Sequence, residues 1–181
     1  ILSNIHKHCL FLYKRKDLMF METNQDDVRY MQIALAEAQC AFEMGEIPVG
    51  CVIVADNQVV GRGHNLTETL QDVTAHAEIQ AITAAASTLG GKYLTQCTLY
   101  VTLEPCSHYG KTPPCCDLII AYGIPRVVIA ATDANLQVNG RGIQKMSDAG
   151  VDVSVGLLKE ESVRLNAAFF SSHLEKRPYI T

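Results

Sequence analysis

Several features that mark other classes of protein are absent from this 181-residue sequence. No run reaches the roughly 18 apolar residues that a membrane-spanning helix needs, and the early apolar run, residues 9–13, is too short for a secretory signal. We find neither an internal repeat nor a low-complexity linker. The seven cysteines form an odd set without the spacing of a disulfide framework. We therefore expect a cytoplasmic protein without a membrane partner, whose thiols are reduced and in part bind metal.

The residues that are present indicate one globular domain with an acidic body. An apolar share of 48% and a length of 181 residues suit a single domain with its own core. Residues 1–24 carry four of the 15 Lys and Arg but only two of the 19 Asp and Glu, so the remainder has a net charge of −6. An acidic body argues against an extended phosphate-binding surface and favours a small-molecule ligand.

The chain divides into a tail and a body. Residues 1–24 show no sustained periodicity, and we expect them to be a disordered or extraneous N-terminal tail outside the fold. The ordered domain is expected over residues 25–175. We expect Asp26 and Asp27 to cap its first helix, whose apolar residues step by three or four along one face that packs in the core: Val28, Met31, Leu35, Ala38 and Phe42.

The pattern behind this helix predicts the fold class. Two β-rich runs around Asp56-Asn57 predict a hairpin. Helical and strand patterns then alternate: helix 76–89, strand 97–103, helix 115–122, strand 126–131, helix 143–149, strand 151–155 and helix 158–170. This alternation indicates parallel βαβ units behind an antiparallel hairpin. We therefore expect a three-layer α/β/α domain with a mixed central sheet and helices on both faces.

Two cysteines frame the loop that follows the strand at 97–103. Cys106 comes at the carboxyl end of this strand, where open α/β sheets hold their active sites. Cys115 follows two prolines that suit a helix start, where the helix dipole and free N–H groups favour a thiolate. His76 and Glu78 open another helix. Two cysteines and one histidine leave one position of a tetrahedral Zn²⁺ open for water, the pattern of a catalytic site.

Glu78 is the candidate catalytic residue of this arrangement. It lies two residues from the predicted ligand His76 and need not bind the metal itself. Zinc lowers the pKa of its water to about 7, and Glu78 is placed to move the proton to a leaving amine. Alternatives remain open: Cys116 or His108 could close a structural zinc site as a fourth ligand, and Cys116 could replace Cys115. A zinc-stabilised, non-catalytic hybrid or binding module also stays open.

These residues resemble a known superfamily. His76-Ala-Glu78, followed by Pro105-Cys106 and a second cysteine, resembles the cytidine deaminase-like zinc deaminases, although eight residues rather than two separate the cysteines here. The loop PCSHYGKTPPC and the chain beyond it, to RPYIT, resemble the deaminase half of the bifunctional riboflavin-biosynthesis deaminase/reductase. In that family RPYIT begins the reductase, so we expect residues 176–181 to be its stub and no NADPH chemistry.

The first half of the chain resembles a different family. YMQIALAEAQCAFEMGEIPVGCVIV and GRGHNLTETLQDVTAHAE are similar to bacterial tRNA adenosine deaminases. The two resemblances, over residues 26–105 and 98–181, meet in TLYVTLEPC, so the chain looks like a chimera.

The two resemblances imply different ends of a substrate site. The riboflavin family implies that His108, Lys111 and Asn135 line its phosphosugar end, and the adenosine family implies a base pocket with Asn65 as a hydrogen-bonding residue and Val49 as a wall. We expect a hydrolytic deaminase of diaminohydroxyphosphoribosylaminopyrimidine, whose partner is a small phosphoribosyl pyrimidine. Adenosine-to-inosine deamination of tRNA is the alternative. Both families form oligomers, so a homo-oligomer is expected.

Overall fold

The computed structural model describes residues 24–110, 113–133, 139–168 and 171. The predicted tail, apart from Asn24, and the predicted stub at 176–181 lie outside this part of the chain. Helices and strands alternate in the order α2 Gln25–Glu43, β1 Gly50–Ala55, β2 Gln58–His64, α3 Ala77–Leu89, β3 Cys97–Leu103, α4 Cys115–Ala121, β4 Arg126–Ala131, α5 Arg141–Asp148, β5 Asp152–Val155 and α6 Lys159–Leu165. Among the described helices, none is long and apolar enough to cross a membrane.

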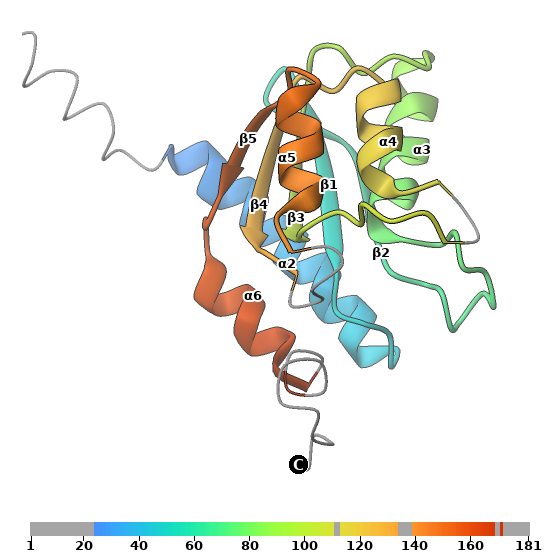
Figure 1. Cartoon of the computed structure of the whole chain (residues 1–181), viewed down its shortest axis with the longest axis vertical. Coiled ribbons are helices and arrows are strands. Elements are labelled where there is room, and N and C mark those ends of the chain that lie inside the picture. The colour runs from blue at the N-terminus through green and yellow to red at the C-terminus, as the bar shows by residue number, and fades with distance from the viewer. Residues whose placement is uncertain (1–23, 111–112, 134–138, 169–170, 172–181) are drawn as a thin grey trace, which may run out of the picture.

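The strands form one mixed sheet in the order β2-β1-β3-β4-β5 (Figure 1). β1 pairs antiparallel with both β2 and β3, whereas β3, β4 and β5 run parallel. The predicted hairpin and the predicted parallel units are therefore both present, and the expected mixed three-layer fold is confirmed. The carboxyl ends of β3 and β4 lie side by side, with Leu103 opposite Ala131.

Each face of the sheet buries its own apolar cluster because strand side chains alternate between faces. Along β1, Cys51 and Ile53 pack with α3, α4 and α5, whereas Val52 and Val54 pack with α2. The same alternation continues along β3 and β4. Helices consequently cover both faces, and the two cores hold the sheet between them (Figure 1).

The local sequence determines the hairpin conformation, and a glycine in β2 determines how closely α3 lies on the sheet. Asp56 and Asn57 have φ values of 48° and 59°, the left-handed conformation that a two-residue hairpin needs and that Asp and Asn tolerate. In β2, a Cβ on Gly63 would lie 2.9 Å from the Ala77 carbonyl oxygen. The absence of a side chain there lets the first turn of α3 lie directly on the sheet, and this turn carries the candidate active-site residues.

Two predictions about α2 are wrong. The cap is Asn24, whose Oδ1 accepts from the Asp26 N–H at 3.1 Å, while Asp26 and Asp27 lie in the first turn. Of the predicted apolar stripe, Phe42 is 52% exposed, and Val28 and Leu35 are only half-buried. The buried residues of α2 are Tyr30, Met31, Ala34, Ala38 and Ala41. The helix lies so close to the sheet that a Cβ on Gly50 would come within 2.0 Å of the Ala34 carbonyl oxygen. Little space therefore remains for large side chains on the buried face of α2.

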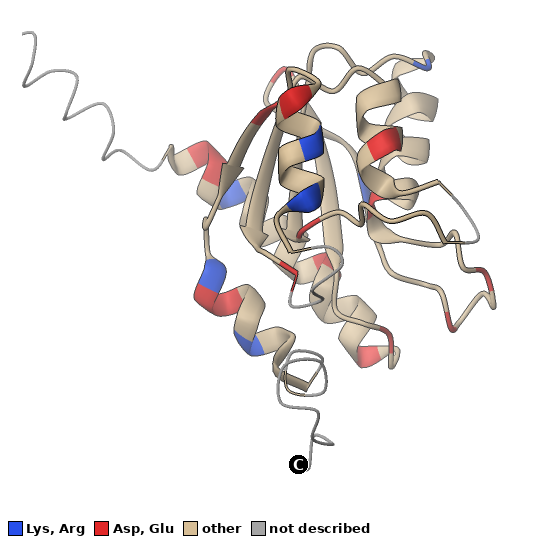
Figure 2. Ribbon diagram, in the orientation of Figure 1, with Lys and Arg blue, Asp and Glu red and all other residues tan. Residues whose placement is uncertain are grey.

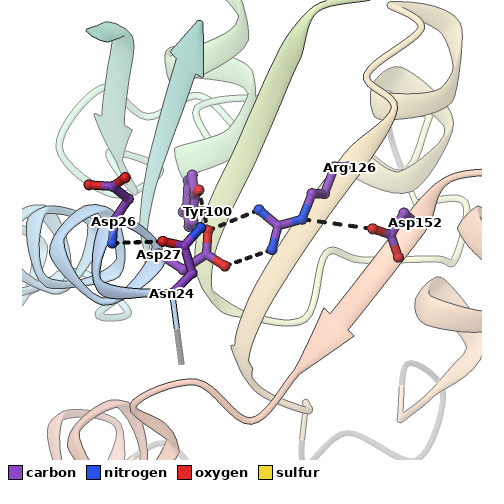
Figure 3. A network of polar contacts seen from close by, with 6 residues as sticks. All are labelled: Asn24, Asp26, Asp27, Tyr100, Arg126 and Asp152. Carbon is purple, nitrogen blue, oxygen red and sulfur yellow. Dashed lines mark hydrogen bonds and ion pairs between the residues drawn. The ribbon is translucent and has the colours of Figure 1, made fainter. Parts of the chain in front are cut away.

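A polar network ties α2 to the amino end of the parallel strands (Figure 3). Asp27 accepts two hydrogen bonds from the Arg126 guanidinium, at 2.9 and 2.7 Å, and one from the Tyr100 hydroxyl at 2.6 Å. Arg126 also lies 3.7 Å from Asp152 on β5. The hydrogen bonds from Arg126 lower the pKa of Asp27 below its usual value. The network lies at the end of the strands opposite to Leu103 and the loop that contains Cys106, and it joins four elements.

Candidate active site

Three potential metal ligands from three elements meet at the carboxyl end of β3. His76 directly precedes α3, Cys106 follows β3, and Cys115 is the first residue of α4. The His76 Nδ1 lies 3.4 Å from the Cys115 Sγ and 4.0 Å from the Cys106 Sγ, and the three ligand atoms all lie within 4.8 Å of one another. The structure thus brings together the predicted ligand residues although 39 positions separate His76 from Cys115.

The start of α4 organises the two thiols. Pro114 is the N-cap residue, and the free N–H of Cys115 donates to the Cys106 Sγ at 3.2 Å. The Cys115 thiol also forms a hydrogen bond with the Cys106 sulfur, and this hydrogen bond lowers the pKa of Cys106 to about 4. The same interaction, followed by burial, raises the pKa of Cys115. The helix start was expected to favour a thiolate at Cys115, but the Cys115 N–H stabilises the thiolate of Cys106 instead.

The donor set fits zinc. Two cysteine sulfurs and one imidazole nitrogen are the ligands of a common class of catalytic zinc site, which keeps one position for water or substrate. Within the described residues, no further His, Cys, Asp or Glu joins this cluster. Cys116, the predicted alternative ligand, is buried away from it, and its thiol donates to Asp117 at 3.7 Å.

Glu78 lies in the first turn of α3, next to these ligands. Its side chain is only 4% exposed although it carries an ionisable carboxyl group. Burial, and after it the negative charge of Cys106, raise the pKa of Glu78 to about 7. A buried carboxyl group with a perturbed pKa beside such a cluster is typical of functional sites.

An open cavity of about 130 Å³ lies above the cluster. His76, Glu78 and Cys106 form its floor, and the remaining lining residues are Ile47, Val49, Asn65, Thr67, Leu103 and Glu104. The lining therefore combines an apolar wall with a few polar groups, as is common for small-molecule sites.

The structure places two of the predicted substrate-binding residues at this cavity. Val49 and Asn65 both line it. Asn65 is 8% exposed, and its Oδ1 accepts from the Ala77 N–H at 3.0 Å. This bond satisfies a free N–H at the start of α3 and leaves the NH₂ group as the donor that Asn65 can offer a ligand. His108 is exposed in the loop after Cys106, while Lys111 and Asn135 lie outside the described residues.

Two buried carboxylates beside the cavity were not among the predicted site residues. Glu46 is 4% exposed and accepts from the Thr67 hydroxyl and from the Glu68 and Thr69 N–H groups, at 2.7 to 3.2 Å. Burial raises its pKa, but these hydrogen bonds outweigh burial and lower it overall. Glu104 is 3% exposed and belongs to the cavity lining. For Glu104, the available signal was an acidic residue placed directly after an apolar-rich strand.

The comparisons with known proteins agree with this geometry. Residues 24–131 match the family described as cytidine and deoxycytidylate deaminase zinc-binding region. The chain is 42% identical to the diaminohydroxyphosphoribosylamino-pyrimidine deaminase of Buchnera aphidicola subsp. Acyrthosiphon pisum (strain APS), over 80% of this chain and 94% of that protein.

Solved structures share the fold. Form 1 of RibD from Acinetobacter baumannii superposes with a TM-score of 0.75 and 34% identity, over 86% of this chain and 42% of that one. A structure from a study of A-to-I editing by tRNA:A34 deaminases gives a TM-score of 0.65 and 37% identity, over 76% and 98%. Both resemblances expected from the sequence are thus found. The chain spans about 40% of the length of the curated riboflavin biosynthesis proteins that it matches. It belongs to the cytidine and deoxycytidylate deaminase zinc-binding family.

Proposed function

We propose that this chain is a zinc-dependent hydrolase that deaminates the diaminohydroxyphosphoribosylaminopyrimidine of riboflavin biosynthesis. The observation that carries this proposal is the 42% identity to an enzyme of that name over 94% of its length. The buried Glu78 beside His76, Cys106 and Cys115 supports it, because these residues supply the groups that hydrolytic deamination needs.

In this proposal His76, Cys106 and Cys115 hold the zinc ion and Glu78 moves protons. Zinc bound in such a site supplies a Lewis acid that lowers the pKa of water to about 7. The Glu78 carboxylate accepts a proton from the attacking water and passes it to the departing amine. The ring carbon loses ammonia and gains a carbonyl oxygen, so one water is consumed for each ammonia released.

The cavity lining supports a flat heterocyclic substrate. Ile47, Val49 and Leu103 offer apolar surface to the ring, and the Asn65 NH₂ group donates a hydrogen bond to it. His108 is exposed in the loop after Cys106, where it can approach a phosphosugar. Contacts from Lys111 and Asn135 to the same end of the substrate remain predictions.

Deamination of adenosine in tRNA is the second candidate function. The structure from the tRNA:A34 deaminase study is 37% identical and is covered to 98% of its length, which favours this candidate. Charge argues against it. Figure 2 shows Lys and Arg on α2, α5 and α6 beside Asp and Glu instead of gathered in one field, whereas RNA binding draws on clustered basic residues.

Ammonia release from two substrates separates these candidates. The zinc-loaded protein is incubated with the pyrimidine nucleotide and, separately, with a tRNA anticodon stem-loop that contains the target adenosine. We expect turnover of the nucleotide. Turnover of the RNA alone would overturn the proposed substrate, and zinc binding without turnover of either would leave the non-catalytic hybrid.

Two broader expectations belong to this proposal. Residues 25–175 form the deaminase domain, which limited proteolysis of the whole chain should leave intact. The protein self-associates, as both related families imply, and light scattering should give a mass above the 19.8 kDa of one chain.

A further inference from the structure

Glu104 is a buried carboxylate that joins the zinc-ligand loop to the segment between β4 and α5. It follows β3 directly and precedes Cys106 by two residues. Its side chain is 3% exposed at the cavity wall. A buried carboxylate needs several donors to offset its loss of hydration. The donors that the described residues give Glu104 are backbone N–H groups between residues 133 and 143.

Both oxygens of Glu104 are engaged. Oε2 accepts from the Gly140 N–H at 2.9 Å and from the Asp133 N–H at 3.4 Å. Oε1 accepts from the Gly142 N–H at 3.1 Å and from the Ile143 N–H at 3.4 Å. Asp133 lies shortly after the end of β4, and Gly140 directly precedes α5. One carboxylate oxygen therefore binds the backbone after β4 and the backbone before α5.

The contacts also complete the start of α5. The N-cap residue is Gly140, which has a φ of 80° and no side chain that could accept from the free N–H groups of the first turn. Helix starts need such acceptors, and a negative group is favoured there. Glu104 supplies the acceptor from a residue 36 positions earlier in the chain.

A second contact, between two backbone segments, also holds the start of α5 against the chain that leads into Cys106. A Cβ placed on Gly142 would lie 2.5 Å from the Pro105 carbonyl oxygen and 3.3 Å from the Glu104 Oε1. The first turn of α5 therefore lies directly against the peptide that leads into Cys106. Only glycine fits at this point without moving one of the two segments.

We propose that Glu104 is a positioning residue of the active site. By accepting hydrogen bonds from the start of α5 while Pro105 packs against Gly142, it fixes the direction in which the chain enters Cys106. The same hydrogen bonds hold Asp133, which follows β4, and Gly140, which precedes α5, to the chain that leads into Cys106. The effect on the proposed deamination rests on the function proposed above, whereas the effect on the metal ligand does not.

The first test measures zinc release from the whole protein to a chromophoric chelator. Glu104→Gln keeps the shape of the side chain but turns an NH₂ group toward backbone N–H donors. We expect zinc release at least tenfold faster than in the wild type. The control is Asp27→Asn, which removes another hydrogen-bonded carboxylate, at the opposite end of the strands. Equal release rates in Glu104→Gln and Asp27→Asn would overturn the proposal, even if the wild type proves inactive.

The second test uses the steady-state kinetics of ammonia release. We expect Glu104→Gln to lower kcat by at least tenfold, Glu104→Asp to recover part of the loss, and Asp27→Asn to retain the wild-type kcat. Gly142→Ala should reproduce the defect from the side of α5. Combining it with Glu104→Gln should add little, because both changes disrupt the same junction between the start of α5 and the chain that leads into Cys106. Wild-type kcat in Glu104→Gln, or full additivity of the two changes, would contradict a shared positioning role.

Discussion

The backbone N–H of Cys115 donates a hydrogen bond of 3.2 Å to the Cys106 sulfur. One predicted metal ligand therefore orients another through its backbone. Pro114 makes this contact available, since its extended backbone starts α4 with the Cys115 N–H free. This hydrogen bond thus keeps the start of α4 next to Cys106, and both sulfurs lie within 4.8 Å of the His76 ligand atom.

Replacement of single cysteines distinguishes the ligands. Cys115→Ser should lose most of the bound zinc and melt at a lower temperature, because metal binding contributes to folding. Cys116→Ser, a change of the same type at the adjacent buried residue, should retain one zinc per chain. Zinc content by atomic emission checks both variants; retention of zinc in Cys115→Ser with loss in Cys116→Ser would assign the ligand to Cys116.

Glu78→Gln should separate zinc binding from catalysis. We expect full zinc content, an unchanged circular dichroism spectrum and a loss of roughly 10²- to 10⁴-fold in kcat, as is typical when a general acid–base group is removed. Glu37→Gln, on the α2 side of the sheet, serves as the control because its carboxylate contacts Arg62 and His64 instead of the cavity. Activity of Glu78→Gln within tenfold of the wild type would exclude the proton-transfer role.

The pair of Asp27 and Arg126 predicts a pH-dependent contribution to stability. The pKa of Asp27 is lowered in the folded protein, so its contribution is present above the unfolded pKa of about 4. It is lost as the pH falls through the folded value, where Asp27 takes up a proton. Asp27→Asn should cost about 1 to 3 kcal/mol of unfolding free energy at pH 7.

Urea unfolding of both proteins at a series of pH values measures this contribution. The difference between wild type and Asp27→Asn should shrink steadily as the pH is lowered below about 4. A difference that stays constant over this range would mean that the charge of Asp27 contributes nothing.

Asn166 should influence the cavity wall from the end of α6. It is fully buried, and its NH₂ group donates to the Pro48 carbonyl at 2.9 Å, between the wall residues Ile47 and Val49. Asn166→Ala should cost about 1 to 3 kcal/mol, because the Pro48 carbonyl loses its donor. We expect the same change to raise KM more than it lowers kcat.

Ser162→Ala is the matched control for Asn166. The Ser162 hydroxyl donates to the Thr102 carbonyl at 2.5 Å. The variant therefore also loses a buried hydrogen bond of α6, but the hydrogen bond from Asn166 to the Pro48 carbonyl stays in place. It should lower the melting temperature and leave KM unchanged. If both variants shift KM equally, the effect comes from α6 as a whole.

Much of the architecture followed from local patterns. The strands at 97–103 and 126–131 were predicted with their observed bounds, because an apolar run between turn residues has few alternative conformations. Asp56-Asn57 predicted the hairpin, since these residues tolerate positive φ. The stripe on α2 failed at Phe42, because periodicity alone cannot say how closely a helix lies on its sheet.

The fold class and the residue types of the candidate site could be predicted from the sequence alone: His76, Glu78, Cys106 and Cys115 follow from spacing, prolines and the order of elements. The contacts that support this site exist only in the folded chain. Glu104 caps a helix 36 residues further on, and Asn166 reaches Pro48 across 118 residues. Such contacts leave no periodic signal, because they depend on which segments the sheet brings together and not on the residues next to them in the chain.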